Sequence, residues 1–131
     1  MARPASSQPT EVELQILRAL WERGTATVGE IHSALKAEKD TNYSTTVKML
    51  SVMLEKNLVK RDESVRPHVY KPMATQLSTQ RRMLRDLIHK VYDGSAGSLV
   101  LQALSSQKAT KEQLAEIRRL LDELEGKSSD E

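Results

Sequence analysis

The residues best suited to molecular recognition lie in one continuous stretch, residues 42–72 of the 131-residue chain. Ser44, Thr45 and Lys48 stand at the start of a short helical pattern, on the side opposite its apolar residues. Small hydroxyl side chains and an amine near the start of a helix can reach base edges in the DNA major groove. The pattern therefore makes these three residues candidate base contacts.

A basic two-stranded pattern follows this helix directly. Residues 58–62 and 68–72 have the composition of antiparallel strands, and residues 63–67 form the loop that connects them. Pro72 cannot donate a hydrogen bond to a strand ladder, so the second strand is expected to end there. The sequence predicts a β-hairpin beside the helix.

Positive charge is concentrated on this helix and hairpin. Residues 42–73 carry six cations and three anions, whereas residues 74–131 carry nine of each. A local positive excess is what a phosphate-binding surface requires. Arg61, Arg66 and His68 are the candidate phosphate contacts, and Arg66 is the strongest because the tip of a hairpin reaches furthest.

Each of these residues also has an ordinary structural interpretation. Ser44 and Thr45 can cap the helix, since hydroxyl side chains are common at helix starts. Lys48 can be a solvated surface lysine, and the hairpin cations can be ordinary strand and loop residues. A segment of this kind can also bind another protein, so a protein-interaction module without DNA binding is the alternative function.

Three helical patterns must position the reading segment. They are predicted over residues 10–23, 27–37 and 42–56, and the polar residues 38–41 separate the last two. Capping-box sequences open the first two helices. The residues expected to face a shared core are Leu14, Leu17, Leu20, Trp21, Ile31, Ala34, Leu35, Thr46, Met49, Leu50 and Met53. Three helices followed by a hairpin is the order of a winged helix-turn-helix.

The remaining helical region is expected to need a partner. Helices are predicted over residues 78–92, 96–104 and 110–125, which is too little chain for an adequate core of its own. The apolar residues expected to pair with a second copy of the chain are Leu84, Leu87, Val91, Leu114, Ile117, Leu121 and Leu124. A two-fold dimer predicts an inverted-repeat operator, with half-sites about 10 bp apart or a multiple of that.

Composition excludes several other classes of protein. The chain has no cysteine, so neither disulfides nor thiolate metal sites are expected. No apolar run is long enough for a membrane span, and the start of the chain does not have the pattern of a signal peptide. His32, His68 and His89 lack ligand spacing, and no nucleophile–base set is found. We expect a cytoplasmic protein that is not an enzyme and binds no cofactor.

Motifs spread over residues 8–125 carry a family resemblance. They are Glu13–Trp21, Tyr43–Leu50, Glu55–Val59, Arg61–Glu63, His68–Tyr70, Val91–Ser95, Ser98–Leu101 and Leu114–Leu121. Together and in this order they resemble the penicillinase-repressor (BlaI/MecI/CopY) family. The resemblance implies a mainly α-helical fold with a small β-hairpin. The expected parts are a disordered Pro/Ser-rich tail (1–9), a winged-helix DNA-binding domain (10–74), a helical dimerisation arm (75–125) and a polar tail (126–131).

The resemblance also implies a mechanism. Such proteins are homodimeric repressors that bind TACA/TGTA-type inverted repeats, and their base-reading positions match Ser44, Thr45 and Lys48, although relatives often have Thr at the position of Lys48. In antibiotic-responsive members, a membrane metalloprotease sensor triggers cleavage of the arm. Gln102 and Ala103 replace the cleaved Asn-Phe pair of the staphylococcal members. The cysteines of the copper-responsive branch are absent, which excludes copper sensing by that route.

Overall fold

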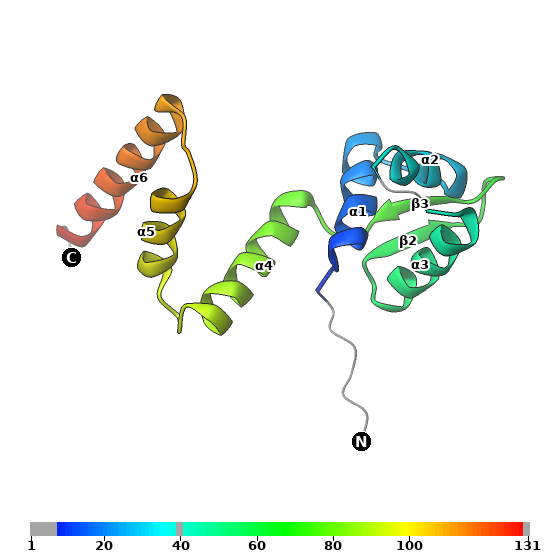
Figure 1. The fold of residues 1–131 in the computed structure, drawn as a ribbon, viewed down its shortest axis with the longest axis horizontal. Helices are drawn as coiled ribbons and strands as arrows, with labels where there is room; N and C mark the ends of the chain where they lie inside the picture. The colour runs from blue at the N-terminus through cyan, green and yellow to red at the C-terminus, as the bar shows by residue number, and fades with distance from the viewer. Residues whose placement is uncertain (1–7, 39–40, 130–131) are drawn as a thin grey trace, which may run out of the picture. The chain divides into compact units, whose positions relative to one another are not determined.

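The computed structural model describes residues 8–38 and 41–129 (Figure 1). Predictions for residues 1–7, 39–40 and 130–131 lie outside this range. The chain divides into two compact units, residues 1–84 and 85–131. The elements are α1 (Glu11–Arg23), β1 (Ala26–Thr27), α2 (Val28–Glu38), α3 (Tyr43–Glu55), β2 (Val59–Asp62), β3 (Val69–Pro72), α4 (Gln76–Val91), α5 (Ala96–Ser106) and α6 (Lys111–Ser129).

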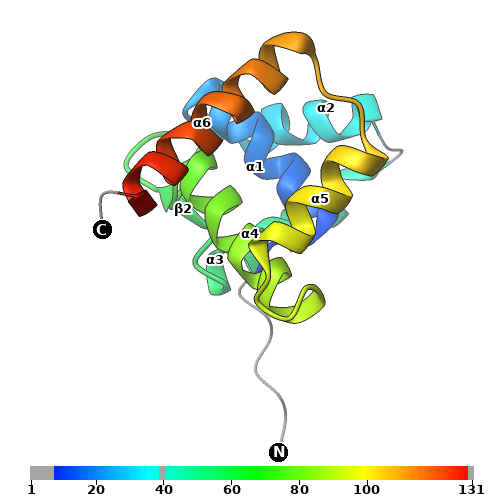
Figure 2. The ribbon, with the colours of Figure 1, turned by 90° about the vertical axis from the view of Figure 1, so that its left-hand side faces the viewer.

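Both predicted capping boxes are present. At the start of α1, Glu13 N–H donates to Thr10 Oγ1 at 3.2 Å, and Thr10 N–H donates to Glu13 Oε1 at 2.9 Å. Thr27 and Glu30 make the same reciprocal pair at the start of α2, at 3.2 and 2.9 Å. Each pair satisfies two backbone donors that a helix start leaves open. The two helices lie side by side (Figures 1 and 2).

The core of the first unit is built from helices α1–α3 and the sheet. Its buried apolar residues are Ile16, Leu17, Leu20, Ala26, Ile31, Leu35, Leu50, Met53, Val59 and Tyr70. The predicted core set contained helical residues only, so it missed Ala26, Val59 and Tyr70; among the helical residues it missed Ile16 and was wrong for Ala34, which is exposed. Ile31 and Leu35 lie four residues apart on one face of α2, and Ala34 lies beyond the edge of that face. Met49, Leu14 and Trp21 are half-buried around the core.

The sheet has one more strand than the sequence predicted. Its order is β1-β3-β2, with both neighbours antiparallel, and the third strand is the two-residue β1. A strand of two residues is too short to show a period-2 pattern. Ala26 pairs with Tyr70, so β1 ties the start of α2 to the hairpin.

A buried ion pair fixes the end of α3 against α1. Lys56 Nζ donates to Glu13 Oε1 at 2.7 Å and to the Gln8 carbonyl at 3.1 Å. The two side chains are only 12% and 5% exposed. Gln8 and Pro9, which the sequence assigned to a disordered tail, are half-buried here. The second of these bonds joins the lysine to the residues that precede α1.

The C-terminal helices follow the predicted breaks. Asp93 (φ 50°) and Gly94 (φ 83°) have left-handed backbones between α4 and α5. Thr110 and Gln113 make a reciprocal cap at the start of α6. However, α6 extends to Ser129, through residues that the sequence assigned to a polar tail, because one glycine near a helix end costs only about 1 kcal/mol. None of the helices in the described part of the chain has the length and apolar character needed to cross a membrane.

Candidate nucleic-acid interface

The first turn of α3 presents its hydroxyl side chains to solvent. The N-cap is Asn42, whose Oδ1 accepts from Thr45 N–H at 3.0 Å. Ser44 Oγ and Thr45 Oγ1 donate to the same oxygen at 3.0 and 2.7 Å. Neither hydroxyl is therefore the cap itself. With their protons directed at Asn42, both oxygens keep lone pairs for a donor such as an adenine or cytosine amino group.

Lys48 lies one turn further along the same exposed face. Its side chain is exposed and has no ion pair within residues 8–38 and 41–129. The opposite face of α3 is fixed in the core by Thr46, Leu50 and Met53, which are all fully buried. A rigid helix thus holds a row of outward polar side chains, as groove reading requires.

Tyr43 is a candidate contact that the sequence interpretation missed. Its ring is 53% exposed at the start of α3, and it packs edge-on against His32 of α2, with ring centroids 5.6 Å apart. His32 Nδ1 also lies 3.0 Å from Thr46 Oγ1. The signal was an aromatic residue directly before two small hydroxyl residues, and the contact that orients it comes from another helix.

The hairpin presents its three predicted cations differently. Arg61 is bound to Glu63, with Nε and Nη2 at 3.0 and 2.6 Å from Oε1. Hydrogen bonding with Tyr70, and then with Glu63, raises the pKa of Arg61. Arg66 is exposed in the loop and has no ion pair in the described part of the chain. His68 is half-buried, and its Nε2 is buried without a hydrogen bond. Arg66 is therefore the most available of the three.

Two lysines on the hairpin were counted in its charge but not proposed as contacts. Lys60 of β2 and Lys71 of β3 are both exposed and stand directly opposite each other in the sheet. Like charges in this position destabilise a sheet, so a bound polyanion would relieve their repulsion. The nearby Asp62 has a lowered pKa, first through hydrogen bonds from Ser64 and then through the field of these lysines.

The second unit has apolar faces without a core. None of residues 85–127 is buried. Among the predicted dimerisation residues, Leu114 and Ile117 are half-buried, whereas Leu84, Leu87, Val91, Leu121 and Leu124 are 44–63% exposed. The apolar surface of this unit is therefore left largely open to solvent.

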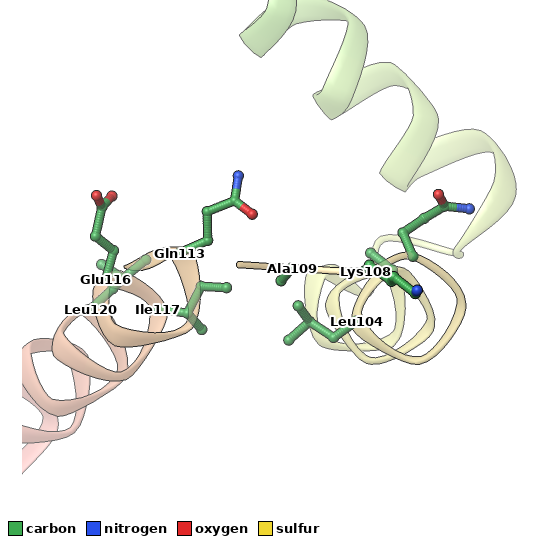
Figure 3. A pocket seen from close by; sticks show the side chains of 9 residues that line it. Leu104, Lys108, Ala109, Gln113, Glu116, Ile117 and Leu120 are labelled. Atoms are coloured by element: carbon green, nitrogen blue, oxygen red, sulfur yellow. The ribbon is translucent and has the colours of Figure 1, made fainter. Parts of the chain in front are cut away.

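A hollow of about 440 Å³ separates α5 from α6. Leu104 and Ile117 point toward each other across it (Figure 3). Gln102 and Ala103, the residues at the cleavage position, are both exposed in the middle of α5, and Ala103 also lines the hollow.

Nothing in the described part of the chain resembles a metal centre. No group of three His, Asp or Glu side chains there is placed to hold an ion. His32 is engaged with α3, His68 belongs to the hairpin region and His89 lies on α4.

These features define a winged helix-turn-helix protein in which one polar face of α3 is exposed. The chain matches the family described as penicillinase repressor over residues 9–123, and it belongs to that family. The predicted fold class and family are thereby confirmed. Members of the family are transcriptional regulators and not enzymes. The chain is therefore a DNA-binding repressor. This finding disfavours the interaction-module alternative.

Individual relatives have low identity but long coverage. The transcriptional regulator BlaI of Mycobacterium tuberculosis (strain CDC 1551 / Oshkosh) is 28% identical over 116 residues, which cover 88% of this chain and 83% of that protein. The penicillinase repressor of Bacillus licheniformis is 21% identical over 116 residues, with coverage of 88% and 91%. The methicillin resistance regulatory protein MecI of Staphylococcus aureus (strain N315) is 20% identical over 112 residues, with coverage of 86% and 91%.

Proposed function

We propose that this protein is a homodimeric repressor that places one winged helix in each half of an inverted-repeat operator in the cytoplasm. The observation that carries the proposal is the exposed row Ser44, Thr45 and Lys48 on a core-anchored α3. The hairpin adds Arg66, which has no ion pair among residues 8–38 and 41–129. In this proposal the α3 row reads bases of a TACA/TGTA-type sequence. Arg66, with the opposed Lys60 and Lys71, holds phosphates.

The dimer contact is proposed for the apolar faces of α4 and α6. Most of their leucines are exposed, and the unit that contains α5 and α6 has no buried residue among residues 85–127. Isolated units of this size seldom support a core, so a second copy is the simplest cover. Two linked heads bind two half-sites with much higher apparent affinity than one head binds one.

Release by cleavage between Gln102 and Ala103 is the proposed route of induction, with a membrane metalloprotease sensor system as the trigger. Both residues are exposed, but they lie inside α5. A helical segment must open locally before a protease can bind it in extended form. In this proposal the protease acts on α5, which lies in a unit without buried residues between positions 85 and 127.

Fluorescence anisotropy tests the DNA-binding part. We expect the protein to bind a TACA/TGTA inverted-repeat duplex more tightly than a scrambled duplex at every salt concentration. Equal affinity for the two duplexes would contradict sequence-specific repression. Size-exclusion chromatography with light scattering tests the dimer, and a monomer at micromolar concentration would refute that part alone.

A further inference from the structure

Helix α4 carries positive charge that neither the reading helix nor the hairpin accounts for. Residues 76–91 contain four cations and one anion. The anion, Asp86, is paired with Lys90 at 3.1 Å. Three arginines are left over, of which Arg81 and Arg82 belong to the DNA-reading unit that ends at Leu84. The family interpretation assigns this helix to the arm and gives these two residues no role.

The start of α4 is fixed to the reading unit by specific contacts. Trp21 Nε1 donates to the Ala74 carbonyl at 2.9 Å, just before the helix. Thr79 is 6% exposed, and its hydroxyl donates to the Thr75 carbonyl at 3.0 Å. Arg81 and Arg82 follow within one turn of this buried threonine. They therefore project from a support that is part of the reading unit.

Arg82 lies beside the end of the reading helix. It lines a hollow of about 260 Å³ together with Lys56, Asn57 and Leu58, the residues that follow α3. Lys56 is committed to Glu13, so its charge is compensated. In a homeodomain, the C-terminal end of the reading helix contacts the DNA backbone. A cation at this end of α3 therefore has the position at which the recognition helix of a homeodomain contacts the DNA backbone.

Neither arginine has a compensating partner among the residues that the structure describes. Both are exposed, and no hydrogen bond or ion pair involves them within the part of the chain that the structure describes. The charge of the whole chain is also divided between its units, with a net +4 over residues 1–84 and −2 over residues 85–131. The surplus lies on the unit that carries the reading helix, which favours a polyanion over an acidic protein as the partner.

We propose that Arg81 and Arg82 bind phosphates of the DNA duplex and extend the interface beyond α3 and the hairpin. This inference rests on the proposed DNA binding. A guanidinium can bind two phosphate oxygens at once, which makes it a strong and sequence-independent anchor. The two residues add affinity and orientation, and they leave base preference to α3.

The test compares the double variant Arg81→Gln/Arg82→Gln with the unchanged protein, using anisotropy between about 50 and 200 mM salt. Losing two phosphate contacts should reduce the slope of log K against log salt by about 1.8 for each bound subunit. The inverted-repeat duplex and the scrambled duplex should weaken by the same factor. Arg118→Gln/Arg119→Gln is the matched control, because it removes two adjacent exposed arginines from α6 and should leave the slope unchanged.

Each alternative outcome is distinct. If the unchanged protein binds neither duplex, the proposed function itself fails. If it binds and the α4 variant keeps the same slope, only this inference is wrong. Equal losses in both double variants would indicate a general charge effect and overturn the site. Dissociation of the dimer in the α4 variant alone, seen by light scattering, would assign these arginines to an acidic partner surface instead.

A role in stabilising α3 is tested separately. A cation beside a helix C-terminus interacts favourably with the helix dipole, so Arg82→Gln could act through folding. Arg81 does not line the hollow, and Arg81→Gln should still lower the slope by about 0.9. Unchanged urea unfolding, followed by Trp21 fluorescence, shows that the variant remains folded. An unchanged slope in this folded variant would refute the inference for Arg81.

Discussion

The buried pair of Glu13 and Lys56 offers a sharp test of how the reading helix is held. Replacing Lys56 with Met keeps most of the side-chain volume and removes the charge. Glu13 then has a carboxylate only 5% exposed, which still accepts a hydrogen bond from the Thr10 N–H. Breaking a buried ion pair typically costs about 3–5 kcal/mol. Because the Thr10 bond is kept and Lys56 is itself 12% exposed, we expect about 2–3 kcal/mol.

The chain has a single tryptophan, and Trp21 lies in the reading unit, so its fluorescence during urea unfolding reports on that unit. The expected loss corresponds to a fall in Tm of about 10–20 °C. Glu13→Gln/Lys56→Met, which removes both charges, should recover much of the loss. Lys36→Met changes an exposed lysine and is the control. If Lys56→Met unfolds within about 0.5 kcal/mol of the unchanged protein, as a surface substitution would, the pair does not hold α3 in place.

Three further predictions concern the hairpin and reading helix, the arm and a helix cap. Arg66→Ala should weaken binding to all duplexes alike and lower the slope of log K against log salt by about 1 for each subunit. Lys48→Thr should instead change the preference between operator sequences. Anisotropy with operators that carry single-base-pair substitutions separates the two effects. Leu121→Asp should convert the dimer to monomer in light scattering, because it would place a charge in an apolar contact; an intact dimer would exclude Leu121 from the interface. The pKa of Glu30 is lowered, mainly by the backbone hydrogen bond from Thr27. The Glu30 carboxylate therefore contributes fully to the stability of the folded protein above its unfolded-state pKa, and this contribution is lost as pH falls through the lower folded-state pKa. Glu30→Gln should therefore flatten the dependence of urea unfolding on pH in this acidic range, and an unchanged profile would show that the cap has no such role.

Local rules were enough to predict most of the first unit. Its two capping boxes are each set by residues within one turn of each other. Such contacts depend little on the rest of the fold, so the sequence predicts them well. The same holds for the exposed face of α3, because one helical period separates buried Thr46 and Leu50 from the outward residues.

The features that the sequence missed depend on contacts between distant segments. The strand β1 exists only because Ala26 meets Tyr70, 44 positions away. The half-burial of Gln8 depends on Lys56. Non-local pairing of this kind leaves no periodic signal in the chain. Arg61 is a different case: it was assigned to DNA from its charge, and its pairing with Glu63, two positions away, follows from the local conformation of the hairpin.

The absence of a core in the arm has a consequence for the proposed release mechanism. Residues 85–127 bury nothing by themselves, so the structure of this unit would depend on the partner copy. A cut between Gln102 and Ala103 would detach α6 with Leu114, Ile117 and Leu121, leaving α4 without its proposed cover. The two winged-helix domains would then bind half-sites independently and lose the increase in apparent affinity that comes from their linkage, which is roughly 10²–10⁴-fold. Cleavage would thus lower operator occupancy without altering any residue that contacts DNA. A Gln102-truncated chain that remained dimeric, or that kept full affinity for the inverted repeat, would contradict this coupling.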